Sequence, residues 1–217
     1  MTSEAKSRIV NALTFARVPL IFLWLGFAIA QEFAPEGAVG IALASVACLM
    51  MLLSGLTDAF DGWLARRWDV VSTLGKMADP LMDKVFYIVA CPALAWQVMH
   101  QGESVAHGIA MMAFTILYML RDTWVTFMRS LGTMYGADVG AMRLGKVRTA
   151  LSFPGAGWIY VYLCFRQFEL FRVDNVWTAS VWPASVFFVE ALLAALTIAS
   201  LFTYTKAYMV YLKRAMH

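Results

Sequence analysis

The sequence predicts an all-α, polytopic integral membrane protein with six transmembrane helices. Hydrophobic residues make up 61% of the 217 positions, and only 14% of the positions are charged. A soluble domain carries roughly 25% charged residues, and the mean hydropathy of this chain is +0.68. Apolar runs of about 18 or more residues recur along the chain, and runs of that length are typical of transmembrane helices.

The six predicted spans cover residues 18–31, 38–57, 78–99, 106–128, 148–168 and 181–211. The first span is short, and we expect an interfacial stretch from Ser7 to Arg17 to extend it. The last span is longer than one crossing needs, so its end should protrude into water. No linker or repeat divides the chain, so we expect residues 1–217 to form one membrane domain, with segment 1–17 cytoplasmic or interfacial.

The first span has one competing interpretation. The run VPLIFLWLGFAIA followed by QE resembles the apolar region and cleavage site of a signal peptide. The segment before it is long for such a signal, so we expect the first span to remain in the protein.

The distribution of basic residues predicts which loops face the cytoplasm. These residues are concentrated before the first span, between the second and third, before the fifth and after the sixth: Lys6, Arg8, Arg17, Arg66, Arg67, Lys76, Arg143, Lys146, Arg148, Lys206, Lys213 and Arg214. Because positive charge favours the cytoplasmic side, both termini and segment 58–83 should face the cytoplasm from a multi-pass position in the inner membrane. The net charge of +3 suits a membrane surface better than a nucleic acid.

Four aspartates lie in the segment around the second and third spans. Asp58 and Asp61 are three residues apart, and Asp79 and Asp83 are four residues apart, so each pair shares one helix face. If the second and third spans pack antiparallel, the four carboxylates converge at the cytoplasmic ends of these helices. The alternative interpretation is that they are ordinary solvated residues at helix ends.

A cluster of carboxylates in a membrane protein needs a counter-charge. One carboxylate at the centre of a span costs roughly 2.5–3.5 kcal/mol on insertion scales, and four together repel one another. Divalent cations relieve this repulsion, and an all-carboxylate set of ligands suits Mg²⁺ or Mn²⁺ and argues against zinc. Two such ions can clamp the attacking and leaving oxygens of a phosphoryl transfer.

The spacing around these aspartates fits the pattern D-x2-D-G-x2-A-R-x8-G-x3-D-x3-D without a gap. The matching positions are Asp58, Asp61, Gly62, Ala65, Arg66, Gly75, Asp79 and Asp83. In this motif and in its six-span layout, the chain resembles the CDP-alcohol phosphotransferase family. The resemblance implies an integral membrane enzyme, usually a homodimer, that transfers a substituted phosphate from a CDP-linked donor to an alcohol and releases CMP.

The resemblance also implies a role for each motif residue. Two divalent cations, Mg²⁺ or Mn²⁺, would be bound by Asp58, Asp61, Asp79 and Asp83, and Asp83 would also act as the catalytic base. Arg66 would pair with the donor phosphates. The residues that would bind the CDP donor are Gly62, Ala65, Arg66, Ser72, Gly75, Asn11, Thr14 and Arg17.

Basic residues near the fourth and fifth spans are candidates for an acceptor pocket. Arg121 and Arg129 are eight residues apart, close to one helix face, and Lys146 and Arg148 lie at the start of the fifth span. Intramembrane arginines mark functional sites by default, and the four cations together could bind an acceptor that carries a phosphate. The alternatives are a structural Arg–Asp pair with Asp122, and ordinary basic residues on the cytoplasmic side.

Three segments narrow the choice of acceptor. LRDTWVTFMR, GKVRT and NALTFARVP resemble segments of bacterial phosphatidylglycerophosphate synthases, although Asp122 and Arg148 replace the usual Glu and Lys, and Pro19 follows Arg17 closely. The resemblance implies transfer of the phosphatidyl group from CDP-diacylglycerol to sn-glycerol 3-phosphate, giving phosphatidylglycerol phosphate and CMP in phospholipid biosynthesis. Inositol phosphate, serine and phosphatidylglycerol are the alternative acceptors.

Two other classes of protein compete with a transferase. A divalent-metal transporter would also need intramembrane carboxylates, and a scaffolding membrane protein would need only the helices. Neither needs the arginine and glycines of the motif, and no second acidic cluster continues a path across the membrane.

Overall fold

The computed structural model describes residues 2–35, 37–70, 73–102, 104–137, 142–168 and 181–216, without the side chains of residues 73, 74, 76, 77, 79 and 80. The described residues form helices throughout, which confirms the all-α prediction. Each helix coincides with one predicted apolar segment. The helices are α1 (Ser3–Glu32), α2 (Ala38–Trp68), α3 (Thr73–His100), α4 (Val105–Met134), α5 (Arg143–Gln167) and α6 (Trp182–Ala215).

Four of the described helical segments are long and apolar enough to cross a membrane. They are α1, α2, residues Leu81–His100 of α3, and α6. Charged side chains occupy the second half of α4 and the first turns of α5, which lowers the hydropathy of both helices. The chain is therefore a helical membrane protein, and membrane crossing by α4 and α5 stays a prediction.

Helix α1 contains the predicted first span together with the stretch from Ser7 to Arg17 that was expected to extend it. It runs unbroken from Ser3 to Glu32, and the Thr2 hydroxyl caps its start by accepting a hydrogen bond from Ala5 N at 3.3 Å. Such a cap satisfies one of the free N–H groups of the first turn. Arg17 therefore projects from the same continuous helix that enters the apolar core.

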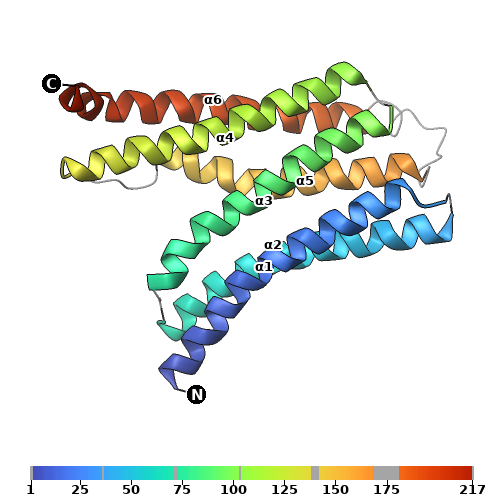
Figure 1. Ribbon diagram of the computed structural model, residues 1–217, viewed down its shortest axis with the longest axis horizontal. Helices are drawn as coiled ribbons and strands as arrows, with labels where there is room; N and C mark the ends of the chain where they lie inside the picture. Colours follow the sequence, from blue (N-terminus) through green and yellow to red (C-terminus); the bar gives the residue numbers. More distant parts are fainter. Residues whose placement is uncertain are drawn as a thin grey trace.

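The helices form two groups that are joined by α3. Helices α1 and α2 pair along their length, α4 and α6 lie side by side in the other group, and α3 crosses from one group to the other (Figure 1). Within the described residues α1 packs on both α2 and α3, whereas α2 and α3 do not pack directly on each other. Direct pairing of the second and third spans therefore does not bring the aspartates together, because α1 mediates between them.

The apolar core fixes the relative positions of α1 and α5. Trp24 and Tyr160 meet edge to face, with ring centroids 5.4 Å apart. The Tyr160 hydroxyl donates a hydrogen bond to Oε1 of the buried Gln31 at 2.8 Å. Ala47 of α2 is fully buried in the same core, and small residues let membrane helices approach closely.

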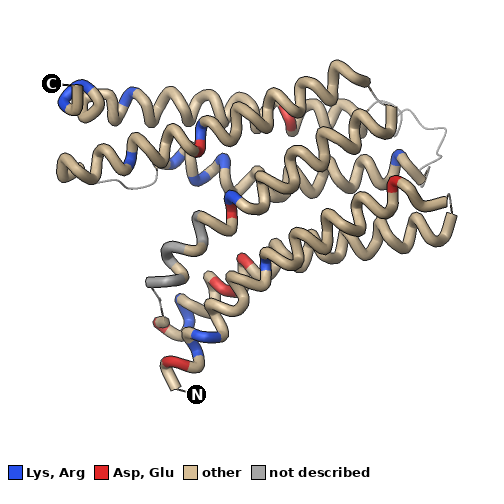
Figure 2. Tube along the Cα trace, viewed as in Figure 1, with Lys and Arg blue, Asp and Glu red and all other residues tan. Residues whose placement is uncertain are grey.

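Charge is distributed unevenly along the bundle. Most Lys, Arg, Asp and Glu residues lie toward the side of the molecule that carries both termini (Figure 2). The opposite side is mainly apolar and contains the core described above. A site for charged substrates is therefore expected on the side that carries both termini.

Candidate active site

Three of the four motif aspartates meet around one arginine. The buried Arg17 of α1 donates from Nη2 to Asp58 in a short hydrogen bond, and the same nitrogen lies 3.4 Å from Asp61 Oδ2. Its Nη1 donates to Asp83 Oδ1 at 3.1 Å. One guanidinium from α1 therefore links two carboxylates of α2 to one of α3, and we call these three aspartates with Arg17 the acidic cluster.

The carboxylates of the acidic cluster differ in exposure. The Asp61 side chain is only 7% exposed and accepts a second hydrogen bond, from Thr14 Oγ1 at 2.8 Å. The side chains of Asp58 and Asp83 are 58% and 42% exposed. Asp61 is therefore fixed by two residues of α1, and the other two carboxylates stay accessible to a ligand. Thr14 and Arg17, which were predicted to bind the donor, hold the aspartates in this structure.

The donor atoms of the acidic cluster fit Mg²⁺ or Mn²⁺, because they are hard carboxylate oxygens. Arg17 supplies one positive charge against three negative charges, so the cluster keeps a formal charge of −2 that a divalent cation would neutralise. Among the described side chains no group of three or more acidic, His or Cys residues is close enough together to hold an ion. The side chain of Asp79, the fourth predicted ligand, lies outside the described residues.

Three of the predicted donor-binding residues, Gly62, Ala65 and Arg66, lie in the C-terminal turns of α2. A Cβ atom added at Gly62 would lie 3.4 Å from Nη1 of the exposed Arg66, which is an ordinary van der Waals contact with a flexible side chain. That Gly62 lets the donor approach the backbone stays a prediction. Of the other predicted donor residues, Gly75 and Asn11 lie on α3 and α1, and Ser72 lies outside the described residues.

A cavity of about 490 Å³ lies between α3, α4, α5 and α6 and is called here the basic cavity. All four predicted acceptor-binding residues line it: Arg121, Arg129, Lys146 and Arg148. Asp83 of the acidic cluster lines the same cavity. A second cavity of about 270 Å³, lined by Arg17 and Asp58, shares Asp83 with the first. The predicted base therefore stands where the acidic cluster and the basic cavity meet.

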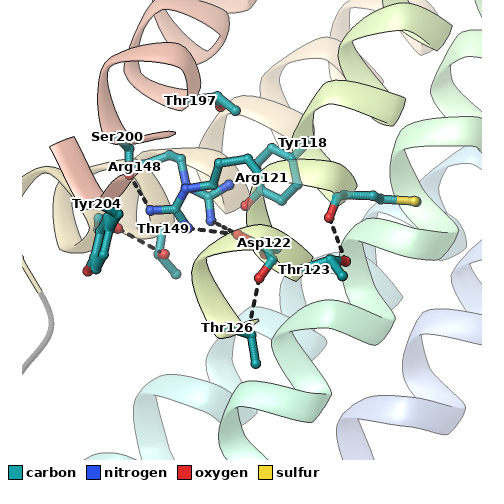
Figure 3. Close-up of polar contacts among 12 residues, drawn as sticks. Tyr118, Arg121, Asp122, Thr123, Thr126, Arg148, Thr149, Thr197, Ser200 and Tyr204 are labelled. Carbon is teal, nitrogen blue, oxygen red and sulfur yellow. Dashed lines mark hydrogen bonds and ion pairs between the residues drawn. The ribbon is translucent and has the colours of Figure 1, made fainter. Parts of the chain in front are cut away.

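One carboxylate organises the arginines of the basic cavity. Asp122 Oδ1 accepts hydrogen bonds from Arg121 Nη1 at 2.8 Å and from Arg148 Nη2 at 2.5 Å (Figure 3). The Arg148 guanidinium lies 4.1 Å from the centroid of the Tyr118 ring. The Arg–Asp pair that was given above as an alternative to an acceptor pocket is therefore present, and it extends to Arg148 on α5, which the sequence did not indicate.

Several arginine nitrogens at the basic cavity are buried without a hydrogen-bond partner among the described residues. They are Nε of Arg121, Arg129 and Arg148, and Nη1 of Arg148. The Arg148 residue is 3% exposed. Buried donors in native proteins are normally satisfied, so this arrangement is suited to an anionic ligand with several acceptor oxygens.

Comparison with known proteins decides which family this site belongs to. The sequence profile described as CDP-alcohol phosphatidyltransferase matches residues 8–199. The match includes the acidic cluster and every predicted acceptor residue. The chain belongs to the CDP-alcohol phosphatidyltransferase family. The resemblance stated from the motif is thereby confirmed, and the chain is a phosphatidyltransferase.

This CDP-alcohol phosphatidyltransferase resembles curated bacterial proteins over most of its length. A CDP-diacylglycerol–glycerol-3-phosphate 3-phosphatidyltransferase from Salmonella choleraesuis is 30% identical over 186 residues, which are 85% of this chain and 87% of the relative. A protein of the same name from Treponema pallidum is 29% identical over 181 residues, covering 83% and 77%. A cardiolipin synthase (CMP-forming) from Streptomyces coelicolor is 29% identical over 161 residues, covering 70% and 68%.

Among the residues of this phosphatidyltransferase that line the basic cavity and were not predicted from the sequence are Lys84, Tyr118 and Tyr204. Lys84 follows Asp83 directly, so its position beside the predicted base was visible in the sequence. Its Nζ donates to Thr126 Oγ1 at 3.3 Å. The two tyrosines face arginines that lie far from them in the sequence or on another helix, and no local pattern pointed to them.

Proposed function

We propose that this phosphatidyltransferase transfers the phosphatidyl group of CDP-diacylglycerol to sn-glycerol 3-phosphate, giving phosphatidylglycerol phosphate and CMP. The observation that carries the proposal is the composition of the basic cavity. Its lining has five basic residues, Lys84, Arg121, Arg129, Lys146 and Arg148, against two acidic ones, Asp83 and Asp122. A phosphate monoester with about −1.5 to −2 charge at neutral pH is complementary to this excess.

The position of Asp83 supports its proposed role as the base that takes the proton of the acceptor hydroxyl. An acceptor whose phosphate is bound by the arginines places its hydroxyl end toward the shared wall of the two cavities, where Asp83 lies. The Asp83 carboxylate takes the hydroxyl proton, and the hydroxyl oxygen forms a new bond to the phosphatidyl phosphorus. The bond from that phosphorus to the oxygen of CMP breaks, and CMP leaves with the bonding electrons. Arg66 pairs with the phosphates of the donor.

Two divalent cations complete the proposed site. Asp58, Asp61, Asp79 and Asp83 would hold them, and bound Mg²⁺ or Mn²⁺ would neutralise the donor diphosphate and lower the pKa of the acceptor hydroxyl. The formal charge of −2 on the acidic cluster supports the binding of divalent cations here, and the number of two rests on the family resemblance. Arg17 and Thr14 would keep Asp61 oriented whether or not an ion is bound.

The proposed enzyme works from the cytoplasmic face of the inner membrane, as a multi-pass protein and a homodimer. Lys and Arg residues are concentrated on the side of the molecule that carries both termini (Figure 2). This supports a cytoplasmic location of that side, because positive charge favours the cytoplasm. Water-soluble glycerol 3-phosphate would reach the site from that side. The homodimer rests on the family resemblance.

Phosphatidylglycerol is the second candidate acceptor, because one relative is named a cardiolipin synthase. Its phosphodiester carries a single negative charge, so it would use less of the positive excess of the basic cavity. Its diacylglycerol half would also have to fit beside the five basic side chains of the cavity.

The test is product identification with purified protein in detergent or lipid vesicles. Protein supplied with CDP-diacylglycerol, Mg²⁺ and glycerol 3-phosphate should release CMP and form phosphatidylglycerol phosphate, which mass spectrometry of the lipids detects. Excess chelator should stop the reaction, and Mg²⁺ or Mn²⁺ should restore it, whereas Zn²⁺ should restore it poorly. Cardiolipin formation from phosphatidylglycerol at an equal or higher rate would reject the first acceptor in favour of the second.

A further inference from the structure

Helix α6 contributes to the wall of the basic cavity, although no residue beyond Arg148 was assigned to the site. Tyr204 of α6 lines the cavity and is only 3% exposed. Ser200 lies one turn earlier on the same helix and is fully buried. Figure 3 shows Ser200 and Tyr204 beside the arginines of α4 and α5.

Both residues contact Arg121. The Arg121 Nη2 atom donates a short hydrogen bond to Ser200 Oγ. The Arg121 guanidinium also lies 5.2 Å from the centroid of the Tyr204 ring, within the range of a cation–π interaction. Together with Asp122, these contacts define the orientation of the guanidinium from three directions.

Tyr204 also contacts the start of α5. Its hydroxyl accepts a hydrogen bond from the backbone N–H of Met142, the N-cap residue of α5, at 2.8 Å. A Cβ atom added at Gly145 would lie 2.9 Å from Tyr204 Oη and 3.4 Å from Arg121 Nη2. Glycine at position 145 therefore lets the first turn of α5 approach α4 and α6 closely.

We propose that Tyr204, with Ser200, is a positioning residue for the acceptor site. These two side chains hold the Arg121 guanidinium of α4 and the first turn of α5 in place, so that basic side chains from both helices can bind the same phosphate group. The proposal rests on the proposed function, since it assumes a phosphorylated acceptor in the basic cavity. In the described residues the backbones of α4 and α5 do not pack on each other, and both helices pack on α3 and α6. Tyr204 is the side chain of α6 that reaches both Arg121 of α4 and the start of α5.

The experiment compares Tyr204→Phe, which removes only the hydroxyl, with Ser200→Ala. Each variant should raise the KM for glycerol 3-phosphate about three- to tenfold, the effect of one lost hydrogen bond. The KM for CDP-diacylglycerol should stay within about twofold, since the donor is bound at the acidic cluster. Tyr211→Phe is the matched control, because Tyr211 lies at the same end of α6 and does not line the cavity. It should leave both constants unchanged.

A double-mutant cycle distinguishes positioning from general stabilisation. Ser200→Ala in an Arg121→Ala background should have no further effect on the acceptor KM, because Ser200 acts through Arg121. Additive effects, or a Tyr204→Phe variant that behaves like Tyr211→Phe, would overturn the proposal while leaving the function intact. Wild-type protein that does not use glycerol 3-phosphate would overturn the proposed function and this inference together.

Discussion

The acidic cluster and the basic cavity use opposite arrangements of charge. In the acidic cluster one arginine, Arg17, contacts three carboxylates. In the basic cavity one carboxylate, Asp122, contacts two arginines. Each centre holds its side chains in place with a single counter-charge and keeps an excess of the other sign. The excess is negative where divalent cations are proposed and positive where the acceptor phosphate is proposed.

The opposite charges of the acidic cluster and the basic cavity suit two different roles in the proposed reaction. Changes in the acidic cluster should affect metal binding and chemistry, and changes in the basic cavity should affect recognition of the acceptor. Asp83 belongs to both regions, because it contacts Arg17 and lines the basic cavity. The strongest effect is therefore expected at this residue.

Asp83→Asn should reduce turnover by about 10²- to 10⁴-fold, the usual contribution of a positioned base. Asparagine keeps the size of the side chain but cannot accept a proton from the acceptor hydroxyl. Binding of a cytidine nucleotide, measured by calorimetry, should largely survive, because Arg66 and the remaining aspartates are unchanged. Turnover near the wild-type value would show that Asp83 is not the base.

Arg148→Ala should raise the KM for glycerol 3-phosphate about ten- to a hundredfold, since a charge-assisted hydrogen bond contributes roughly 1.5–3 kcal/mol. The KM for CDP-diacylglycerol should change little. Arg148→Lys should not restore the wild-type value, because lysine lacks the planar fork that bonds to Asp122 while stacking on Tyr118. Steady-state kinetics with each substrate varied in turn checks this, and equal effects on both substrates would indicate a structural role.

Lys84→Met should have a smaller effect, a rise of about two- to tenfold in the acceptor KM. The Lys84 side chain is half-buried, and its described hydrogen bond is to the neutral Thr126 hydroxyl, so water screens part of its charge. Methionine keeps the length and the apolar stem. Thr126→Val is the matched control, because it removes the partner and keeps the ammonium. A Lys84→Met variant with unchanged acceptor KM and a raised donor KM would move Lys84 to the donor side of Asp83.

The acidic cluster was easier to predict from sequence than the basic cavity, for a physical reason. The eight motif residues lie between Asp58 and Asp83 on two consecutive helices, so their spacing is visible in one short segment. The contribution of Arg17 was assigned to the donor, because nothing local shows that α1 packs on both α2 and α3. The six helices were predicted from apolar runs alone, whereas their true lengths depend on capping and packing.

The basic cavity depends on contacts between distant parts of the chain. Arg121, Arg129, Lys146 and Arg148 were predicted from charge inside or beside apolar spans, and the structure places all four at one cavity. The shared role of Asp122 and the contribution of Tyr204 were not predictable. They require α4, α5 and α6 to meet at one point, and helix periodicity gives no information on which helices are neighbours.

The central claim is that the basic cavity recognises a phosphate on the acceptor. The most direct test compares glycerol 3-phosphate with glycerol, which has the same carbon skeleton without the phosphate, as acceptors for the wild-type protein. We predict that kcat/KM for glycerol 3-phosphate exceeds that for glycerol by about a hundredfold or more, because at least two charge-assisted hydrogen bonds are lost with the phosphate. Equal use of glycerol, or a preference for an unphosphorylated acceptor such as serine, would contradict the account.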